Sequence, residues 1–236
     1  MAKRYRDLMI DEIEVRGLDE KTQKAYLNAM ELFIKYHNQP PAKLGIEDIK
    51  AYQRYLLKER KLAANSINRH LCGIRFFYRH VLGRHWYADA LPRLKAPKKM
   101  PKILSEQEVA SLINSVHKVL YKAVIMTLYS TGIRNTELRS LQIYDIDSKR
   151  MVIHIRNGKG QRERQALLSP ITLKCLRTYW RLYRMNSKVK SKWLFIPTKN
   201  SHSGNLDKPL SHTAVGYMLD TAAKAAGIKK KSIPIY

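Results

Sequence analysis

A short segment rich in proline and lysine constrains the fold more than any other feature of the sequence. Residues 92–102 read Pro-Arg-Leu-Lys-Ala-Pro-Lys-Lys-Met-Pro-Lys, with three prolines, five basic residues and no acidic residue. Proline lacks a backbone N–H and disfavours helix at the residue before it, so this segment is expected to be extended. The sequence therefore predicts two domains, 1–91 and 103–236, joined by a linker at 92–102. The positive charge of the linker suits a path along phosphates, although a plain basic connection has the same composition.

Positive charge is high on both sides of this linker. The 236 residues carry a formal charge of +26. Residues 1–100 hold 21 Lys and Arg against 11 acidic residues, and residues 101–236 hold 24 against 8. A single basic tail does not produce such a distribution. A polyanionic partner, most often nucleic acid, is the better interpretation, with a merely cationic soluble protein as the alternative.

Other classes of protein find little support in the sequence. Cys72 and Cys175 lie far apart, and no Cys/His cluster has the spacing of metal ligands. No apolar stretch approaches the 18 or so residues of a membrane span, and the first residues do not resemble a signal peptide. We therefore expect a cytoplasmic protein without metal, disulfide, cofactor or membrane segment.

The first part shows the apolar spacing of helices. Helices are predicted from about Asp19 to the Pro40-Pro41 pair, over 46–60, and from Asn65-Ser66, either of which could cap the third helix. Basic and polar residues occupy the remaining faces, where they are either solvated or in contact with phosphates. The candidate DNA contacts in this part are Thr22, Asn68, Arg69 and Arg75.

The second part mixes helices with a small sheet. Ser105 and Glu108 have the spacing of a capping box, and the apolar run 120–128 predicts a buried helix ending at Gly132. Strands are predicted at 151–155 and 164–168, with further strand-like runs at 142–146 and 193–196. Helices are predicted at 135–141, 170–184 and from Ser211 to Gly227. The expected fold is mainly α: an N-terminal helical bundle, then an α+β domain with a small antiparallel sheet.

Two motifs in the second part carry cations on rigid elements. The run Thr131-Gly132-Ile133-Arg134-Asn135-Thr136-Glu137-Leu138 places Arg134 after a tight glycine turn, at the start of a short helix. The turn Asn157-Gly158-Lys159-Gly160, followed by Gln161-Arg162-Glu163-Arg164, lifts Lys159 onto the tip of a hairpin. Two fixed cations suit a phosphodiester that gains negative charge in its transition state. A solvated surface arginine and a solvated turn lysine are the alternatives.

These motifs, in this order behind the basic linker, resemble the tyrosine site-specific recombinases of the phage-integrase family in their compact bacterial Xer-like form. The resemblance covers about residues 5–232. It implies a SAM-like core-binding domain, a catalytic domain and a duplex DNA partner, with other recombinase subunits assembled on the DNA. It also implies a tyrosine that attacks a phosphodiester, forms a 3′-phosphotyrosyl bond and releases a 5′-hydroxyl, without a metal ion or other cofactor.

The resemblance assigns roles to several residues. Arg134 corresponds to an arginine that clamps the phosphate, and Lys159 to the hairpin lysine that protonates the leaving oxygen. Glu137 corresponds to a supporting acidic residue, although a plain surface glutamate is the alternative. Arg162 and Arg164 shape the hairpin or meet phosphates, and the linker lysines Lys98 and Lys99 are candidate DNA contacts.

The sequence departs from the family after Arg184. The family continues with a His-x-x-Arg motif and the nucleophilic tyrosine, but His202 and His212 are followed three residues later by Asn205 and Val215. Tyr236 has no second arginine before it, so no nucleophile is assigned. We therefore expect a truncated, catalytically incomplete member that binds DNA. The alternatives are a non-catalytic regulator of recombination and a general, charge-driven nucleic-acid-binding protein.

Overall fold

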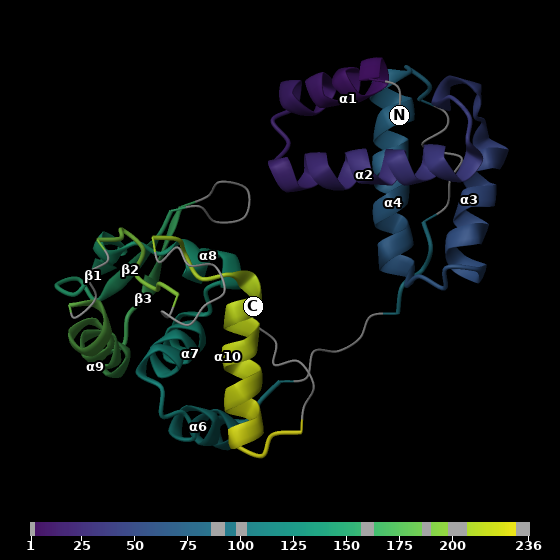
Figure 1. The fold of residues 1–236 in the computed structure, drawn as a ribbon. Helices are drawn as coiled ribbons and strands as arrows, with labels where there is room; N and C mark the ends of the chain where they lie inside the picture. Colours follow the sequence, from purple (N-terminus) through teal and green to yellow (C-terminus); the bar gives the residue numbers. More distant parts are fainter. Residues whose placement is uncertain are drawn as a thin grey trace. The chain divides into compact units, whose positions relative to one another are not determined.

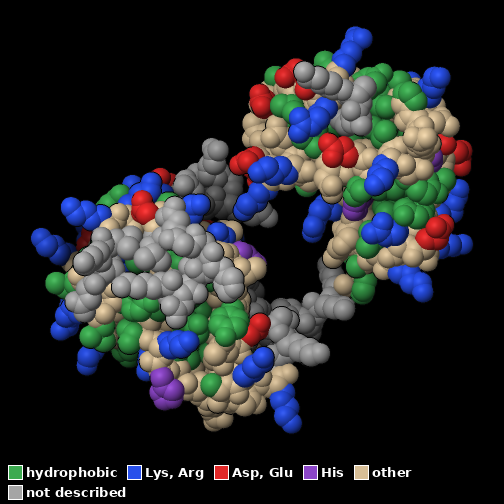
Figure 2. All heavy atoms as spheres, in the orientation of Figure 1, with side chains coloured by type: hydrophobic (Ala, Val, Ile, Leu, Met, Phe, Trp, Pro, Cys, Tyr) green, Lys and Arg blue, Asp and Glu red, His purple; other side chains and the backbone are tan. Residues whose placement is uncertain are grey.

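The computed structural model divides the chain into two compact units, Met1–Lys99 and Met100–Tyr236. It describes residues 3–85, 93–97, 103–156, 163–185, 190–197 and 207–229. Figure 1 shows a helical N-terminal unit and a C-terminal unit in which helices surround a small sheet. Figure 2 shows Lys and Arg side chains on the visible faces of both units. The predicted fold class is therefore confirmed.

Among the residues that the structure describes, four α-helices form the N-terminal unit. They are α1 (Lys3–Val15), α2 (Glu20–His37), α3 (Ile46–Lys58) and α4 (Ala64–Phe76), and a π-helical turn at Phe77–Val81 continues α4. Their apolar faces make one core, which includes Met9, Ile13, Met30, Phe33, Ile49, Tyr52, Ile67, Leu71 and Ile74. The sequence analysis did not predict α1, although Met9 and Ile13 on the inner face of this helix are buried in the core.

Local chemistry determines where these helices begin. The Asp19 carboxylate accepts a hydrogen bond from the Thr22 backbone N–H at 2.6 Å, which caps α2. Helix α4 begins at Ala64, before the predicted start at Asn65-Ser66, and its N-cap residue Ala63 has no side-chain cap. The predicted capping by Asn65 or Ser66 is therefore wrong, because both residues lie inside the first turn.

Gly73 allows α2 and α4 to pack closely. A Cβ atom placed on Gly73 would lie 3.0 Å from the Ala29 Cβ atom and 3.0 Å from the Tyr26 Cα atom. Real Cβ atoms rarely approach neighbours so closely, so the absence of a side chain at Gly73 sets the distance between the helices. This contact fixes the two helices that carry Thr22 and Asn68.

Part of the predicted linker packs against the N-terminal unit. The Asn68 side-chain N–H donates to the Leu94 carbonyl at 2.9 Å, and the Leu94 backbone N–H donates to the Asn68 Oδ1 atom at 3.0 Å. The Leu94 side chain packs against the core of the unit. Residues 93–97 have no helix or strand, as predicted, and the linker role of 92–102 as a whole stays a prediction.

The C-terminal unit is built around one buried helix. Helix α7 (Val119–Thr131) contacts strand β3 (Arg164–Leu167) and four helices: α6 (Glu106–Asn114), α8 (Asn135–Ser140), α9 (Pro170–Tyr179) and α10 (His212–Ala225) (Figure 1). A π-helical turn at Trp180–Arg184 continues α9. The capping box predicted between Ser105 and Glu108 is confirmed, with hydrogen bonds of 2.8 and 3.2 Å.

In the described part of the chain, the sheet has three antiparallel strands in the order β1–β2–β3. Strands β2 (Val152–Ile155) and β3 form the predicted hairpin, with Ile155 paired to Arg164. The strand-like run predicted at 142–146 instead forms a 3-10 turn at Ile143–Asp145, because the Asp145 carboxylate accepts the Gln142 N–H. Strand β1 is confined to Ile146–Asp147, and of the run predicted at 193–196 only Trp193 forms a bridge, to Gln142.

Among the helices of the described part of the chain, none combines the length and the apolar character that crossing a membrane requires.

We predict opposite effects on stability for alanine at two helical glycines. Gly73→Ala gains about 1 kcal/mol of helix propensity but overpacks the α2–α4 contact at a cost of about 1–3 kcal/mol. Gly216→Ala in α10 makes the same gain, and its Cβ atom has no neighbour within 4 Å. Urea unfolding should therefore show a lower midpoint for Gly73→Ala and a higher one for Gly216→Ala. Equal stabilisation by both changes would contradict the close contact.

Candidate functional site

The turn between α7 and α8 positions Arg134. Helix α7 ends at Gly132, whose left-handed conformation (φ 60°) favours glycine and whose N–H donates to the Leu128 carbonyl. Ile133 is buried beyond this turn, so the next residue is anchored on one side. Arg134 then occupies the N-cap position of α8 in an extended conformation. The glycine turn predicted from the sequence is confirmed.

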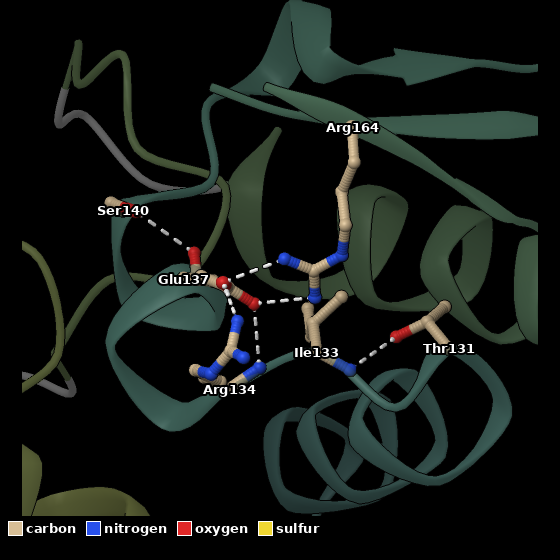
Figure 3. Close-up of polar contacts among 6 residues, drawn as sticks. All are labelled: Thr131, Ile133, Arg134, Glu137, Ser140 and Arg164. Atoms are coloured by element: carbon tan, nitrogen blue, oxygen red, sulfur yellow. Dashed lines mark hydrogen bonds and ion pairs between the residues drawn. The ribbon is translucent and has the colours of Figure 1, made fainter. Parts of the chain in front are cut away.

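Glu137 lies directly under Arg134 in the first turn of α8. One carboxylate oxygen of Glu137, Oε2, accepts the Arg134 backbone N–H at 2.8 Å, and Oε1 accepts the Arg134 Nη1 at 2.8 Å (Figure 3). Only 1% of the Glu137 side chain is exposed, against 47% for Arg134. Glu137 is therefore a buried anchor rather than a surface glutamate, and its negative charge also suits the helix N-terminus.

Arg164 reaches the same carboxylate from β3. Its Nη1 donates to Glu137 Oε1 at 2.7 Å and its Nη2 donates to Oε2 at 2.8 Å (Figure 3). This two-point pairing is the strongest geometry available to an arginine and a carboxylate. It joins the end of the hairpin to the helix that carries Arg134.

The electrostatics of the cluster favour an ionised Glu137. Burial alone would raise the pKa of this carboxyl group, but the hydrogen bonds from Arg164 and Arg134 outweigh burial and lower the pKa to about 2. The hydrogen bond to Glu137 also raises the pKa of Arg164. One carboxylate and two guanidinium groups therefore leave a net positive charge, and the charge lies on arginine side chains that are partly exposed.

Arg134 keeps hydrogen-bonding capacity for a further partner. Within the described residues, the Arg134 donors that make hydrogen bonds are the backbone N–H and Nη1, both to Glu137. A guanidinium has five N–H donors in a planar fork, so Nε and Nη2 remain to meet an anion. The arrangement is chemically suited to holding a phosphate or similar oxyanion at a fixed place on the C-terminal unit.

Four other predicted site residues lie outside the described residues, so the structure does not place them: Lys98, Lys99, Lys159 and Arg162. The strands that flank Lys159 are described, and they end at Ile155 and begin at Arg164.

The remaining candidates lie on α2 and α4 of the N-terminal unit. Thr22 is half-buried in the first turn of α2, Arg69 is exposed on α4, and Arg75 is half-buried. Both polar groups of the Asn68 side chain are engaged by Leu94, which gives that residue a structural role. Contact with DNA stays a prediction for all four residues.

The sequence analysis missed a second buried acid beside Glu137. Asp145 is 2% exposed and accepts the Arg156 Nε at 2.5 Å, and both acids line one small cavity of about 60 Å³. A signal for Asp145 was present in the sequence. Asp145 follows Gln142 by three residues, which is the spacing of an N-cap residue and its capping acid, and Glu137 follows Arg134 at the same spacing. In the described part of the chain, no group of three or more His, Cys, Asp or Glu residues could hold a metal ion.

Comparison with known families matches both units. The model for the phage integrase N-terminal SAM-like domain matches residues 5–88, and that for the phage integrase family matches residues 102–234. The second match covers more than half of the chain.

Individual relatives agree with these matches. A putative integrase/recombinase of Sinorhizobium fredii, y4qK, is 38% identical over 231 residues, which are 98% of this chain and 70% of the relative. A second from that organism, y4eF, is 41% identical over 174 residues, 73% of this chain and 65% of the relative. The chain thus spans about two thirds of the length of these relatives.

A solved structure shares the fold. The crystal structure of a lambda integrase dimer bound to a COC′ core site matches with a TM-score of 0.71 and 16% identity. The match covers 98% of this chain and 83% of that one.

We predict a pH-dependent contribution of Glu137 to stability. Its pKa falls from the ordinary 4.5 to about 2 in the folded chain. The carboxylate therefore stabilises the fold above pH 4.5, and this stabilisation is lost as the pH falls toward 2. A shift of this size corresponds to about 3 kcal/mol.

Glu137→Gln should lower the free energy of unfolding, measured with urea, by about that amount at neutral pH. The difference from the unchanged chain should shrink below pH 4.5. Asp220→Asn, which changes an exposed carboxylate on α10 of the same unit, is the control and should have little effect. A Glu137→Gln effect that stays constant down to the lowest pH would contradict the ionised, hydrogen-bonded Glu137.

Proposed function

The chain belongs to the phage integrase family, and on that basis we propose that it binds duplex DNA and holds a phosphodiester against Arg134. The observation that carries this proposal is the Arg134–Glu137–Arg164 cluster, in which a buried acid fixes a partly exposed guanidinium. The comparisons lend support, since the relatives are named integrase/recombinase and the lambda integrase structure is of a DNA complex. The high positive charge of both parts of the chain favours the same partner.

Arg134 is proposed as one cation of the phosphate site. A phosphodiester under attack gains negative charge on its non-bridging oxygens, and a planar guanidinium can hold two of them at once. The rigid anchor matters because electrostatic stabilisation is greatest when the donor is already in place. Helix α8, Gly132 and Glu137 together provide that preorganisation.

Lys159 is proposed as the proton donor of the same reaction. When a tyrosine oxygen forms its bond to phosphorus, the bond to the 5′ oxygen breaks and this oxygen takes a proton. A lysine on the segment that connects β2, which ends at Ile155, to β3, which begins at Arg164, is suited to supply it, because its flexible stem follows the leaving oxygen. The phosphotyrosyl product keeps the bond energy, so rejoining requires no nucleotide.

We further propose that these 236 residues by themselves bind DNA without cleaving it. No His-x-x-Arg sequence occurs after Arg184, and no tyrosine is assigned as the nucleophile. Losing one positioned transition-state donor costs about 2.7–4 kcal/mol, and losing the nucleophile removes the covalent route. A second polypeptide segment or another recombinase subunit on the DNA would have to supply the missing groups. Occupation of recombination sites without cleavage would also suit a regulator.

We predict that Arg134→Ala weakens binding to duplex DNA. The affinity, measured by fluorescence anisotropy with a labelled duplex, should fall as salt increases, and the slope of log K against log salt should become smaller by about 1 in the variant. The control is Arg181→Ala, which removes an exposed arginine from the π-helical turn after α9. Equal losses for the two variants would instead favour the general, charge-driven binder.

We predict that the chain forms no covalent complex with a suicide substrate. A nicked duplex that releases a short fragment after cleavage traps a phosphotyrosyl adduct, which a denaturing gel resolves as protein of increased mass. The chain should bind this substrate without forming the adduct, whereas an intact tyrosine recombinase on its own substrate serves as the positive control. An adduct would contradict the proposed inability to cleave and would leave the proposed DNA binding intact.

A further inference from the structure

We infer that Arg164 is a positioning residue that keeps Arg134 available for phosphate by occupying the Glu137 carboxylate. The inference rests on the proposed function, in which Arg134 is a phosphate ligand. It separates the roles of two arginines that share one acid: Arg164 acts through Glu137, and Arg134 meets the DNA.

The hydrogen bonds to Glu137 show how the carboxylate is shared. Oε1 accepts the Nη1 of Arg134 at 2.8 Å and the Nη1 of Arg164 at 2.7 Å. Oε2 accepts the backbone N–H of Arg134 at 2.8 Å and the Nη2 of Arg164 at 2.8 Å. A carboxylate offers about four lone-pair positions, so these four bonds fill its capacity. The Arg134 side chain can therefore hold Glu137 at one point only.

The two arginines differ in how much of their hydrogen-bonding capacity the acid uses. Arg164 directs both Nη atoms to Glu137, and its pairing is the two-point kind that fixes a guanidinium in one orientation. Arg134 directs one Nη atom to it and has the more exposed side chain, 47% against 39%. The geometry therefore favours Arg164 as the structural partner and Arg134 as the group that binds an anion.

Removal of Arg164 would change this division. The Glu137 side chain is almost fully buried, and a buried carboxylate that loses a cationic partner is strongly destabilising. Arg134 is the nearest remaining donor, since its backbone and Nη1 already contact Glu137. Its guanidinium would then turn to pair with both oxygens, and the donors that face the phosphate would be withdrawn.

Arg164 also connects two elements that carry proposed site residues. It is the first residue of β3 and pairs with Ile155 of β2, so it lies at the loop end of the two strands that flank Lys159 in the sequence. Through Glu137 the same residue is attached to α8, which begins after Arg134. A single side chain thus couples the hairpin to the arginine turn.

The test compares five variants of the full chain for binding to a short fluorescein-labelled duplex. Arg164→Gln should weaken binding by about tenfold more than the charge-matched Arg181→Gln. The double variant Arg164→Gln/Glu137→Gln should bind more tightly than Arg164→Gln, because no buried carboxylate then draws Arg134 away. It should bind less tightly than the unchanged chain, because Arg134 has lost its hydrogen bonds to Glu137. When Arg164→Gln is combined with Arg134→Ala, the affinity should be lower than that of Arg134→Ala only by the loss that Arg181→Gln shows. That loss measures the removal of one positive charge.

Two results would overturn the inference while leaving the proposed function standing. In the first, Arg134→Ala weakens binding but Arg164→Gln equals Arg181→Gln, so Arg164 has no influence on Arg134. In the second, the double variant stays as weak as Arg164→Gln, which would show that Arg164 itself meets phosphate. If Arg134→Ala binds as well as the unchanged chain, the proposed phosphate contact fails, and the inference fails with it.

Folding of each variant is checked by circular dichroism before binding is measured. If Arg164→Gln does not fold, Arg164→Lys takes its place, because lysine keeps the charge but offers only a point contact to one oxygen. Its affinity should then fall between those of the unchanged chain and Arg134→Ala, with recovery when Glu137→Gln is added. An affinity equal to that of the unchanged chain would overturn the inference.

Discussion

The Glu137 carboxylate is the interaction on which the C-terminal unit depends most. It is buried, it is the N3 residue of α8, and it accepts four hydrogen bonds from two arginines that arrive from different elements. Without it, the first turn of α8 would lose its cap and the loop end of β3 would lose its attachment to that helix. The cost of burying the charge is offset only because the geometry satisfies both oxygens.

The sequence predicted the elements around this site because their signals are local. Gly132 ends α7, the Ser105–Glu108 box begins α6, and the alternation around Gly158-Lys159-Gly160 predicts β2 and β3. Each of these signals depends on a few neighbouring residues and on backbone conformation that glycine or a capping side chain dictates. The resemblance to a known family then identified Arg134 and Glu137 as members of one site.

The rest could not be predicted because it depends on contacts between distant residues. Nothing near Arg164 indicates that it will pair with Glu137, which lies 27 residues away, rather than with solvent. The hydrogen bonds between the Asn68 amide and Leu94, 26 residues further along the chain, have no local signal either, and the predicted contact of Asn68 with DNA stays a prediction. The missed helix α1 and the strand predicted at 142–146, of which only Ile146 lies in β1, have a similar origin, since tertiary packing and the Asp145 turn override weak local preferences.

The distribution of acids suggests how so basic a chain achieves both affinity and precision. Forty-five basic residues can supply long-range attraction to a polyanion, but a solvated lysine or arginine has no fixed position. Among the described residues, the buried acids are Glu137 and Asp145, both line one cavity, and both hold arginines. A buried acid restricts the conformations of the arginine side chain that it pairs with and neutralises part of the positive charge of that arginine. The arginines with the best-defined positions are therefore those that contact Glu137 and Asp145. In the proposed function, the surface cations supply the long-range attraction to DNA, and the buried Glu137 fixes the position of Arg134, the proposed phosphate contact.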